Sequence, residues 1–176
     1  MAQLILTQKY AKDCRITTLA MPVLIINSLD DWVIDVIRVQ RKKVAMITHV
    51  RSILTFFIPY SHVGGTASIP ACLGVLLQEY IRDHELEQYE KDIKDLFFSD
   101  QFIFTKTNNR KIIGHMNDFK NILKGLTTNT NFDNINWDKV HSYINNTLVK
   151  TSGTEYERPN DLMFQLLEHV YGDYMN

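Results

Sequence analysis

The chain has 176 residues, 45% of them hydrophobic and 22% charged, and its 19 basic and 20 acidic side chains leave a net charge of −1. This composition is typical of a packed globular protein, and it excludes both a disordered chain and a strong overall attraction to nucleic acid or an anionic membrane. At this length we expect one domain over residues 1–176, with a core large enough to fold without disulfides or metal.

The chain opens with a short strand pattern and a helical turn. The apolar residues 4–6 predict a strand, and Thr7 is a suitable N-cap for a helical turn from Gln8 to Cys14. A loop follows, and within it the apolar run at residues 23–26 could form a strand of its own.

The strongest strand signal comes after this loop. Residues 32–39 and 44–49 are rich in Val and Ile and flank a short charged connection, which predicts a β-hairpin. A third apolar run at residues 52–58 stops at Pro59. Together the three runs predict a three-stranded antiparallel meander.

The rest of the chain is mainly helical. Apolar side chains recur at intervals of three and four residues, which predicts amphipathic helices. The helical segments are 70–81, 86–97, 109–126, 137–148 and 161–171, and one further strand is expected at 101–107. Because strands gather early and helices late, we expect an α+β fold, with a small, mostly antiparallel sheet and about five helices packed over one face.

The densest cluster of functional side chains lies on the helix that follows the last predicted strand. On a helical wheel Arg110, Asn117 and Asp118 lie opposite the apolar stripe. A glycine in a helix interior, such as Gly114, lowers the stability of the helix. Its presence would be explained by the close approach of a ligand or another backbone. The polar face could be a binding site. We favour the alternative, in which Asn109 caps the helix while Arg110 and Asp118 tie it to neighbouring strands.

Three stretches of the chain carry a recognisable pattern. They are LTQKYAK at 6–12, the Asp31-Trp32 pair before the hairpin, and T-x-N-R-x-x-x-G-x-M-N-D-F at 107–119. In this combination the chain resembles a bacterial family of domains of unknown function. His115 stands where the pattern has a smaller residue. The resemblance implies a shared α+β fold and brings no activity with it.

The resemblance also singles out a possible constellation of polar residues. Lys9, Arg110 and Asp118 are the catalytic candidates, because a carboxylate beside Lys and Arg could support acid–base chemistry or hold a phosphate. The candidate binding residues are Asp31, Trp32, Asn109, Arg110, His115, Asn117 and Asp118. The same groups could instead form a partly buried salt-bridge network that fixes the first strand against the helix.

The hairpin connection is the most basic part of the chain. Arg38, Arg41, Lys42 and Lys43 could bind the phosphates of a nucleic acid, although hairpin turns are also polar because they are solvated. The glycine-containing loop 62–66 precedes a helix and could bind an anion, but it lacks the Lys-Ser/Thr ending of a P-loop. The six histidines are scattered and the two cysteines form no CxxC pair, so we expect neither a metal site nor a cofactor.

No catalytic pattern stands out, and the first residues lack the basic start and apolar run of a signal peptide. No window approaches the roughly 20 apolar residues that span a bilayer. We therefore favour a cytoplasmic, non-enzymatic interaction or regulatory module, whose partner is another protein or a second copy of the chain, and no membrane. Two alternatives stay open: a small enzyme acting on a phosphorylated or nucleotide substrate, and a nucleic-acid-binding protein that uses the hairpin.

Overall fold

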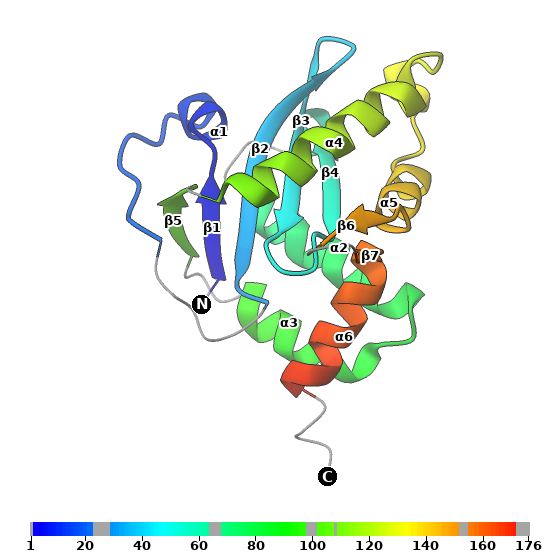
Figure 1. Cartoon of the computed structure of the whole chain (residues 1–176). Helices are drawn as coiled ribbons and strands as arrows, with labels where there is room; N and C mark the ends of the chain where they lie inside the picture. Colours follow the sequence, from blue (N-terminus) through cyan, green and yellow to red (C-terminus); the bar gives the residue numbers. More distant parts are fainter. Residues whose placement is uncertain are drawn as a thin grey trace.

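A five-stranded mixed sheet forms the centre of the molecule (Figure 1). The computed structural model describes residues 2–22, 29–63, 68–97, 102–107, 109–151 and 155–171. The strands are β1 (Ala2–Leu6), β2 (Asp31–Val39), β3 (Lys42–His49), β4 (Thr55–Pro59) and β5 (Phe102–Lys106), in the spatial order β4-β3-β2-β1-β5. The strand expected at residues 23–26 lies outside the described residues.

The sheet is antiparallel on one side and parallel on the other. β2 pairs antiparallel with β3, and β3 pairs antiparallel with β4, as the predicted meander requires. β1 lies inside the sheet and pairs in parallel with both β2 and β5. The expected α+β fold is confirmed. The expectation of a mostly antiparallel sheet is only partly right, because β1 pairs in parallel with one strand from each half of the chain.

Local backbone geometry sets the bounds of the meander. Gln40 and Arg41 connect β2 to β3 with φ of 47° and 70°, the left-handed values that a tight hairpin turn requires. The strand expected from Ser52 begins only at Thr55, because Ile53 turns the chain with φ of 61° and its N–H donates to His49 O at 3.0 Å.

Helices surround the sheet, and the short β6–β7 pair adds a small two-stranded ribbon that the pattern did not predict. The elements are α1 (Gln8–Asp13), α2 (Ile69–Asp83), α3 (Glu90–Phe97), α4 (Arg110–Thr127), α5 (Trp137–Asn145), β6 (Val149–Lys150), β7 (Tyr156–Glu157) and α6 (Pro159–Tyr171), with 3-10 turns η1 (Tyr60–His62), η3 (Glu87–Tyr89) and η4 (Phe132–Asn134). Thr7 caps α1 as expected, since its hydroxyl accepts a hydrogen bond from Tyr10 N.

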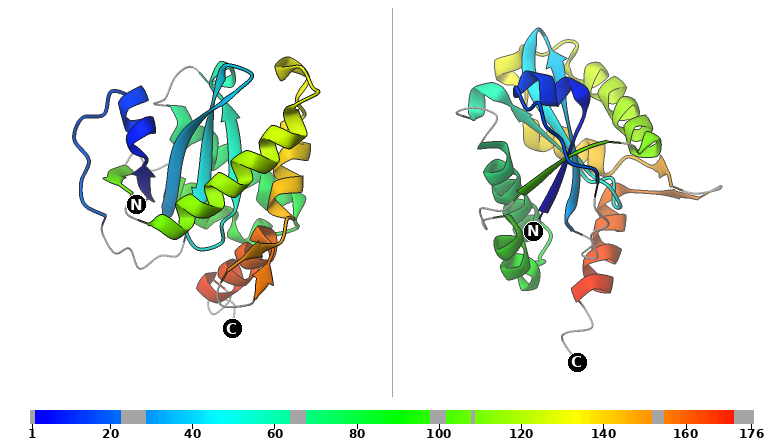
Figure 2. Two further views of the ribbon diagram at one scale, coloured as in Figure 1. Left: turned by 45° about the horizontal axis from the view of Figure 1, so that its top comes forward. Right: turned by 90° about the vertical axis from the view of Figure 1, so that its left-hand side faces the viewer.

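The sheet separates two hydrophobic cores, so the expectation of helices on one face is wrong. On one face, Trp32 and Phe56 pack with residues of α2, α3 and α6. On the other, Val33 and Phe57 pack with Phe119 and other residues of α4 and α5. Figure 2 shows the sheet between these two helical layers. Successive side chains of a strand point to opposite faces, and the strands of this chain are apolar on both, which requires cover on both sides.

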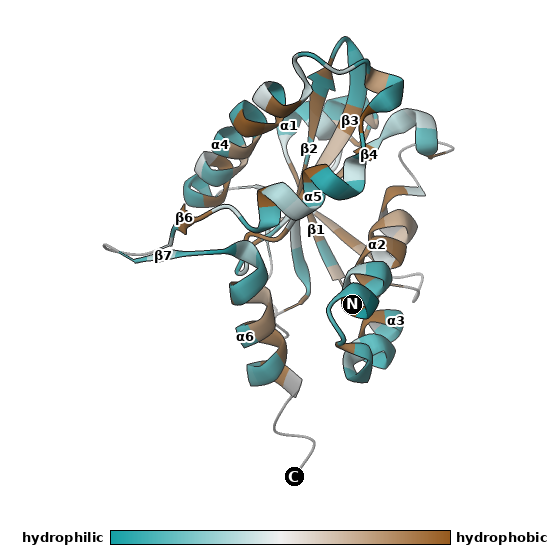
Figure 3. Cartoon of the chain, turned by 90° about the vertical axis from the view of Figure 1, so that its right-hand side faces the viewer, coloured by the Kyte–Doolittle hydropathy of each residue, from teal (hydrophilic) through white to brown (hydrophobic). Residues whose placement is uncertain are grey.

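The helices carry polar and apolar residues in alternation along their length (Figure 3), as expected for elements with one side on a core. Within the described ranges, no helix combines the length and the apolar character that a bilayer span requires.

Candidate functional site

A row of polar side chains crosses the sheet where the parallel strands end. The register pairs Leu6 of β1 with Ile34 of β2 and with the last residue of β5. One step further along each strand stand Thr7, Asp35 and Thr107, on the face that α4 covers. Thr7 N donates to Ile34 O at 3.0 Å and Thr107 N donates to Leu6 O at 3.3 Å, so the strands are still in register at this row.

An ion pair joins this row to α4. Asp35 is only 6% exposed, and its Oδ2 lies 2.8 Å from Nζ of Lys120. The Thr7 hydroxyl donates to Asp35 Oδ1 at 2.6 Å, and Lys120 Nζ also donates to Asn117 Oδ1 at 3.0 Å. Both carboxylate oxygens of Asp35 are therefore engaged, and they hold the Lys120 ammonium at the edge of the sheet.

The helices that follow the neighbouring strands β1 and β5 leave the sheet on opposite faces. α1 contributes Tyr10 and Ala11 to the core shared with α2 and α3, whereas α4 lies over the other core. In open sheets, the crevice outside the carboxyl ends of parallel strands, where the connections diverge in this way, is the usual ligand site.

A basic groove opens at this edge between α1, the end of β2 and the second half of α4. Its volume is about 500 Å³. Four of its lining side chains are cationic, namely Lys9, Arg38, Lys120 and Lys124, and none is acidic. The other lining residues are Ile37, Val39, Gln40, Asn121, Leu123, Thr127 and Thr128. The arrangement is suited to an anionic ligand.

Some of the residues that form this site were not predicted. Asp35 had a signal in the sequence, since it is the one charged residue in the apolar run WVIDVI, and a charge inside such a strand needs a partner. Lys120 and Lys124 lie one helical turn apart on α4, but only the tertiary structure brings them opposite Lys9.

The residues predicted on α4 have separate surroundings. Asn109 caps the helix, accepting from Lys111 N at 3.1 Å and from Ile112 N at 3.2 Å. Arg110 and Asp118 are exposed to solvent. Apart from the chain neighbours of Gly114 and its own helix backbone, no described atom lies within 4 Å of a Cβ added there, so no other described backbone approaches this glycine closely.

Asp31 and Trp32 lie at the other end of the sheet. They open β2, whereas Lys9 follows the carboxyl end of β1, which runs parallel to it. Asp31 Oδ1 accepts from Gln3 Nε2 at 2.8 Å, and burial raises the pKa of its carboxyl group. Trp32 is fully buried, and its indole N–H donates to Leu29 O at 2.8 Å. The predicted constellation is therefore divided between opposite ends of the sheet.

His115 lies in a third location, separate from the basic groove and from the start of β2. Its half-buried ring lines a cavity of about 100 Å³ together with Arg51, Lys111 and Thr151. Burial lowers the pKa of His115, and the neighbouring Lys111 lowers it further. Within the described residues, His115 Nε2 has no hydrogen-bond partner.

The basic hairpin residues are largely engaged within the chain. Lys42 Nζ lies 2.7 Å from Asp133 Oδ1, and Lys43 pairs with Asp13. Arg38 donates from Nη1 to Arg41 O at 3.0 Å while it lines the basic groove. Residues 64–66 of the glycine-containing loop lie outside the described residues.

Comparison with known proteins places the chain in a family. The model of a family described as a domain of unknown function (DUF6933) matches residues 3–162, and the chain belongs to this family. The predicted resemblance to a family of unknown function is thereby confirmed. No curated protein matches the sequence.

Proposed function

We propose that this member of the DUF6933 family is a non-enzymatic binding module that holds a phosphate-bearing ligand in the basic groove. The observation that carries the proposal is the charge of the lining, with four Lys and Arg side chains and no Asp or Glu. Lysine binds phosphate as a point charge, and several lysines around one groove raise the local concentration of anions.

The size and the polar groups of the groove also suit such a ligand. A volume of about 500 Å³ lies within the range of small-molecule sites, roughly 300 to 1,000 Å³. Asn121 and Thr128 add an amide and a hydroxyl to the lining, both of which donate hydrogen bonds to phosphate oxygens. Lys120 is held in place by Asp35 and Asn117, so its ammonium needs little reorganisation to meet a ligand.

Binding is favoured over catalysis by the residue types present. No His, Cys, Asp or Glu is among the lining residues, so lysines are the only common acid–base side chains in the groove, and a cationic lysine must lose its proton before it can act as a base. The Asp35 carboxylate contacts the lining residue Lys120, but both of its oxygens are engaged by Thr7 and Lys120.

A small phosphorylated molecule is favoured over a nucleic-acid strand. Proteins that bind single strands without sequence preference stack bases on aromatic side chains, and the lining of this groove has none. Lys42 and Lys43 belong to the basic hairpin connection that could bind the phosphates of a nucleic acid. Both already form ion pairs within the chain, with Asp133 and Asp13 respectively.

The test is a titration of the intact chain with inorganic pyrophosphate and, separately, with a short single-stranded oligonucleotide. We expect pyrophosphate to shift the backbone amide resonances of α1 and α4, with an affinity that falls as salt is added. The double variant Lys9→Gln/Lys124→Gln should weaken binding at least tenfold.

The matched control is Lys91→Gln/Lys139→Gln, which removes two exposed lysines outside the groove and should leave binding unchanged. Equal loss in both double variants, or no binding of either probe, would contradict the proposal. Binding of the oligonucleotide alone would favour the nucleic-acid alternative.

A further inference from the structure

A second, apolar groove lies at the edge of the sheet, beside the edge strand β4. It has a volume of about 620 Å³ and lies between β4, α2 and α5. Its apolar lining includes Phe57, Ile58, Val63, Val75 and Trp137. Val75 is 46% exposed even though it is a large hydrophobic residue on a helix, so this surface is covered by no other part of the described chain.

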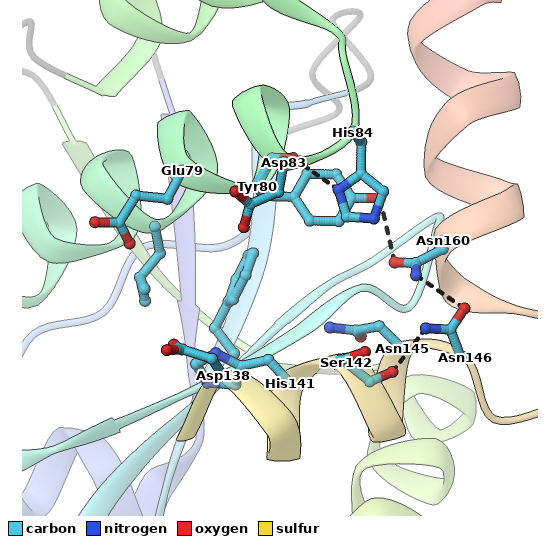
Figure 4. A pocket seen from close by; sticks show the side chains of 12 residues that line it. Glu79, Tyr80, Asp83, His84, Asp138, His141, Ser142, Asn145, Asn146 and Asn160 are labelled. Atoms are coloured by element: carbon cyan, nitrogen blue, oxygen red, sulfur yellow. Dashed lines mark hydrogen bonds between the residues drawn. The ribbon is translucent and has the colours of Figure 1, made fainter. Parts of the chain in front are cut away.

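A polar recess of about 110 Å³ adjoins this groove (Figure 4). The two cavities share Leu76, Asp138 and His141 in their linings, so an apolar cavity and a polar one lie side by side. In Figure 4, Glu79 and Asp83 come from α2 on one wall of the recess, and Asp138 comes from α5 on the facing wall.

Among the described residues, three acidic side chains line the recess and no Lys or Arg does. Neither lining contains a Lys or an Arg, and within the described residues Glu79, Asp83 and Asp138 form no ion pair. Burial lowers the pKa of His141, which disfavours a positive charge on its ring. Its Nε2 lies against the backbone of Phe57, 2.9 Å from N and 3.1 Å from O.

The recess also contains aromatic rings and amide side chains whose N–H groups donate hydrogen bonds within the chain. His84 Nδ1 lies 2.7 Å from Tyr80 O, and a carbonyl only accepts, so Nδ1 carries a proton and donates it. The Tyr80 and His84 rings lie 4.3 Å apart, while Tyr80 Oη donates to Asn160 Oδ1 at 3.2 Å. Three carboxylates beside aromatic rings suit a donor-rich cation.

We propose that the combined site binds a small amphipathic cation, with its apolar body in the groove and its protonated amine in the recess beside Asp138. This ligand is distinct from the phosphate-bearing ligand of the basic groove, and the two sites share no residue. Apolar burial supplies the affinity, and the charge complementarity of the recess selects a cation over an anion.

Two other occupants fit the lining less well. A carboxylate or phosphate head group would face three acidic side chains with no positive partner in the recess. A metal ion is also disfavoured, because within the described residues no group of three His, Cys, Asp or Glu side chains is arranged to hold one.

The experiment compares three probes that differ only in their head group. A phenylbutyl chain carrying an amine, a hydroxyl or a carboxylate is titrated into the isotopically labelled protein near neutral pH, and binding is followed at the indole N–H of Trp137, which lines the groove. We expect the amine to bind at least tenfold more tightly than the alcohol, and the carboxylate to bind more weakly than the alcohol.

Variants separate the contribution of the recess from that of the groove. The triple variant Glu79→Gln/Asp83→Asn/Asp138→Asn should reduce the affinity for the amine to that of the alcohol, while the alcohol binds as before. Asp95→Asn, which removes an exposed carboxylate outside both cavities, should change nothing.

Equal affinities for the three probes would overturn the choice of a cation, as would a preference for the amine that survives the triple variant. The site itself is overturned if no probe shifts the Trp137 resonance, or if the free protein is a dimer that buries Trp137. None of these results bears on pyrophosphate binding, which is measured at α1 and α4.

Discussion

Asn145 of α5 satisfies both backbone polar groups of Thr55 at the edge of the sheet. Thr55 N donates to Asn145 Oδ1 at 2.8 Å, and Asn145 Nδ2 donates to Thr55 O at 2.9 Å. Two residues further along β4, His141 Nε2 lies 2.9 Å from Phe57 N and 3.1 Å from Phe57 O. The side chains of α5 thus take the place of a sixth strand, and Pro59 ends β4 without an N–H to pair.

The first prediction concerns this pairing. Asn145→Leu keeps the approximate volume but leaves the buried N–H and C=O of Thr55 without partners, so we expect the free energy of unfolding to fall by about 2–4 kcal/mol. Urea unfolding measures the change. Asn134→Leu, at an exposed asparagine, is the matched control and should change stability by less than about 0.5 kcal/mol. Similar losses in the two variants would show that the Asn145 side chain does not stabilise β4.

The second prediction concerns the pH dependence of stability through His141. Burial lowers its pKa, so the unfolded chain, in which a histidine titrates near about 6.5, takes up the proton first as the pH falls. The free energy of unfolding therefore decreases as the pH falls below that value, and half-buried His115 acts in the same direction.

His141→Gln offers an acceptor to Phe57 N without titrating. Urea unfolding between about pH 7.5 and 5.5 should show a smaller decrease in this variant than in the unchanged protein. The exposed His169→Gln is the control. If the decrease were the same in all three proteins, protonation of His141 would not be coupled to unfolding.

Local patterns predicted the elements of the fold well, and long-range pairing poorly. The hairpin and meander follow from β-branched runs around a turn, and the helices follow from their spacing, because both signals lie within a few residues. The parallel pairing of β1 with β2 and β5 joins segments up to about a hundred residues apart and leaves no such signal. The near-continuous apolar run of β2 was a usable hint, since strands covered on both faces read in this way.

The candidate site was predicted only in part, for the same reason. Lys9 and Arg38 were both singled out, but for different functions, and the structure brings them into one groove. Lys120 was not singled out, because the sequence alone does not distinguish it from an exposed lysine on the solvent side of a helix. Only the structure shows that it pairs with the buried Asp35. The acidic recess was missed entirely, since Asp83 and Asp138 come from helices far apart in the sequence.

The third prediction concerns Asp30, which precedes β2. The residue is 3% exposed, and burial raises the pKa of its carboxyl group to about 6, from an ordinary value of about 3.9. The charged form is disfavoured in the folded protein, so the stabilising contribution of protonated Asp30 is lost as the pH rises through about 6. Asp30→Asn should raise the free energy of unfolding by about 1–3 kcal/mol near pH 8.

The gain should vanish near pH 4, where Asp30 is protonated in the folded chain as well. Urea unfolding at the two pH values measures both effects, with exposed Asp95→Asn as the control. A gain of equal size at both pH values would contradict the titration of Asp30 as its cause.

The fourth prediction separates the structural role of Lys120 from its place in the basic groove. Lys120→Met leaves the Asp35 carboxylate buried without its counter-ion, and we expect a loss of about 2–4 kcal/mol, below the largest values for buried pairs because the Lys120 side chain is 27% exposed. Lys124→Met, one turn further along the same helix and without an ion pair within the described residues, should cost less than about 0.5 kcal/mol.

The double variant Asp35→Asn/Lys120→Met completes the cycle. The asparagine still accepts from the Thr7 hydroxyl but carries no charge, so the double variant should be at least about 1 kcal/mol more stable than the sum of the two single losses implies. Urea unfolding of the four proteins gives this coupling energy. Additive losses would mean that Asp35 and Lys120 do not stabilise one another, and the ammonium would then not be held in place for a ligand.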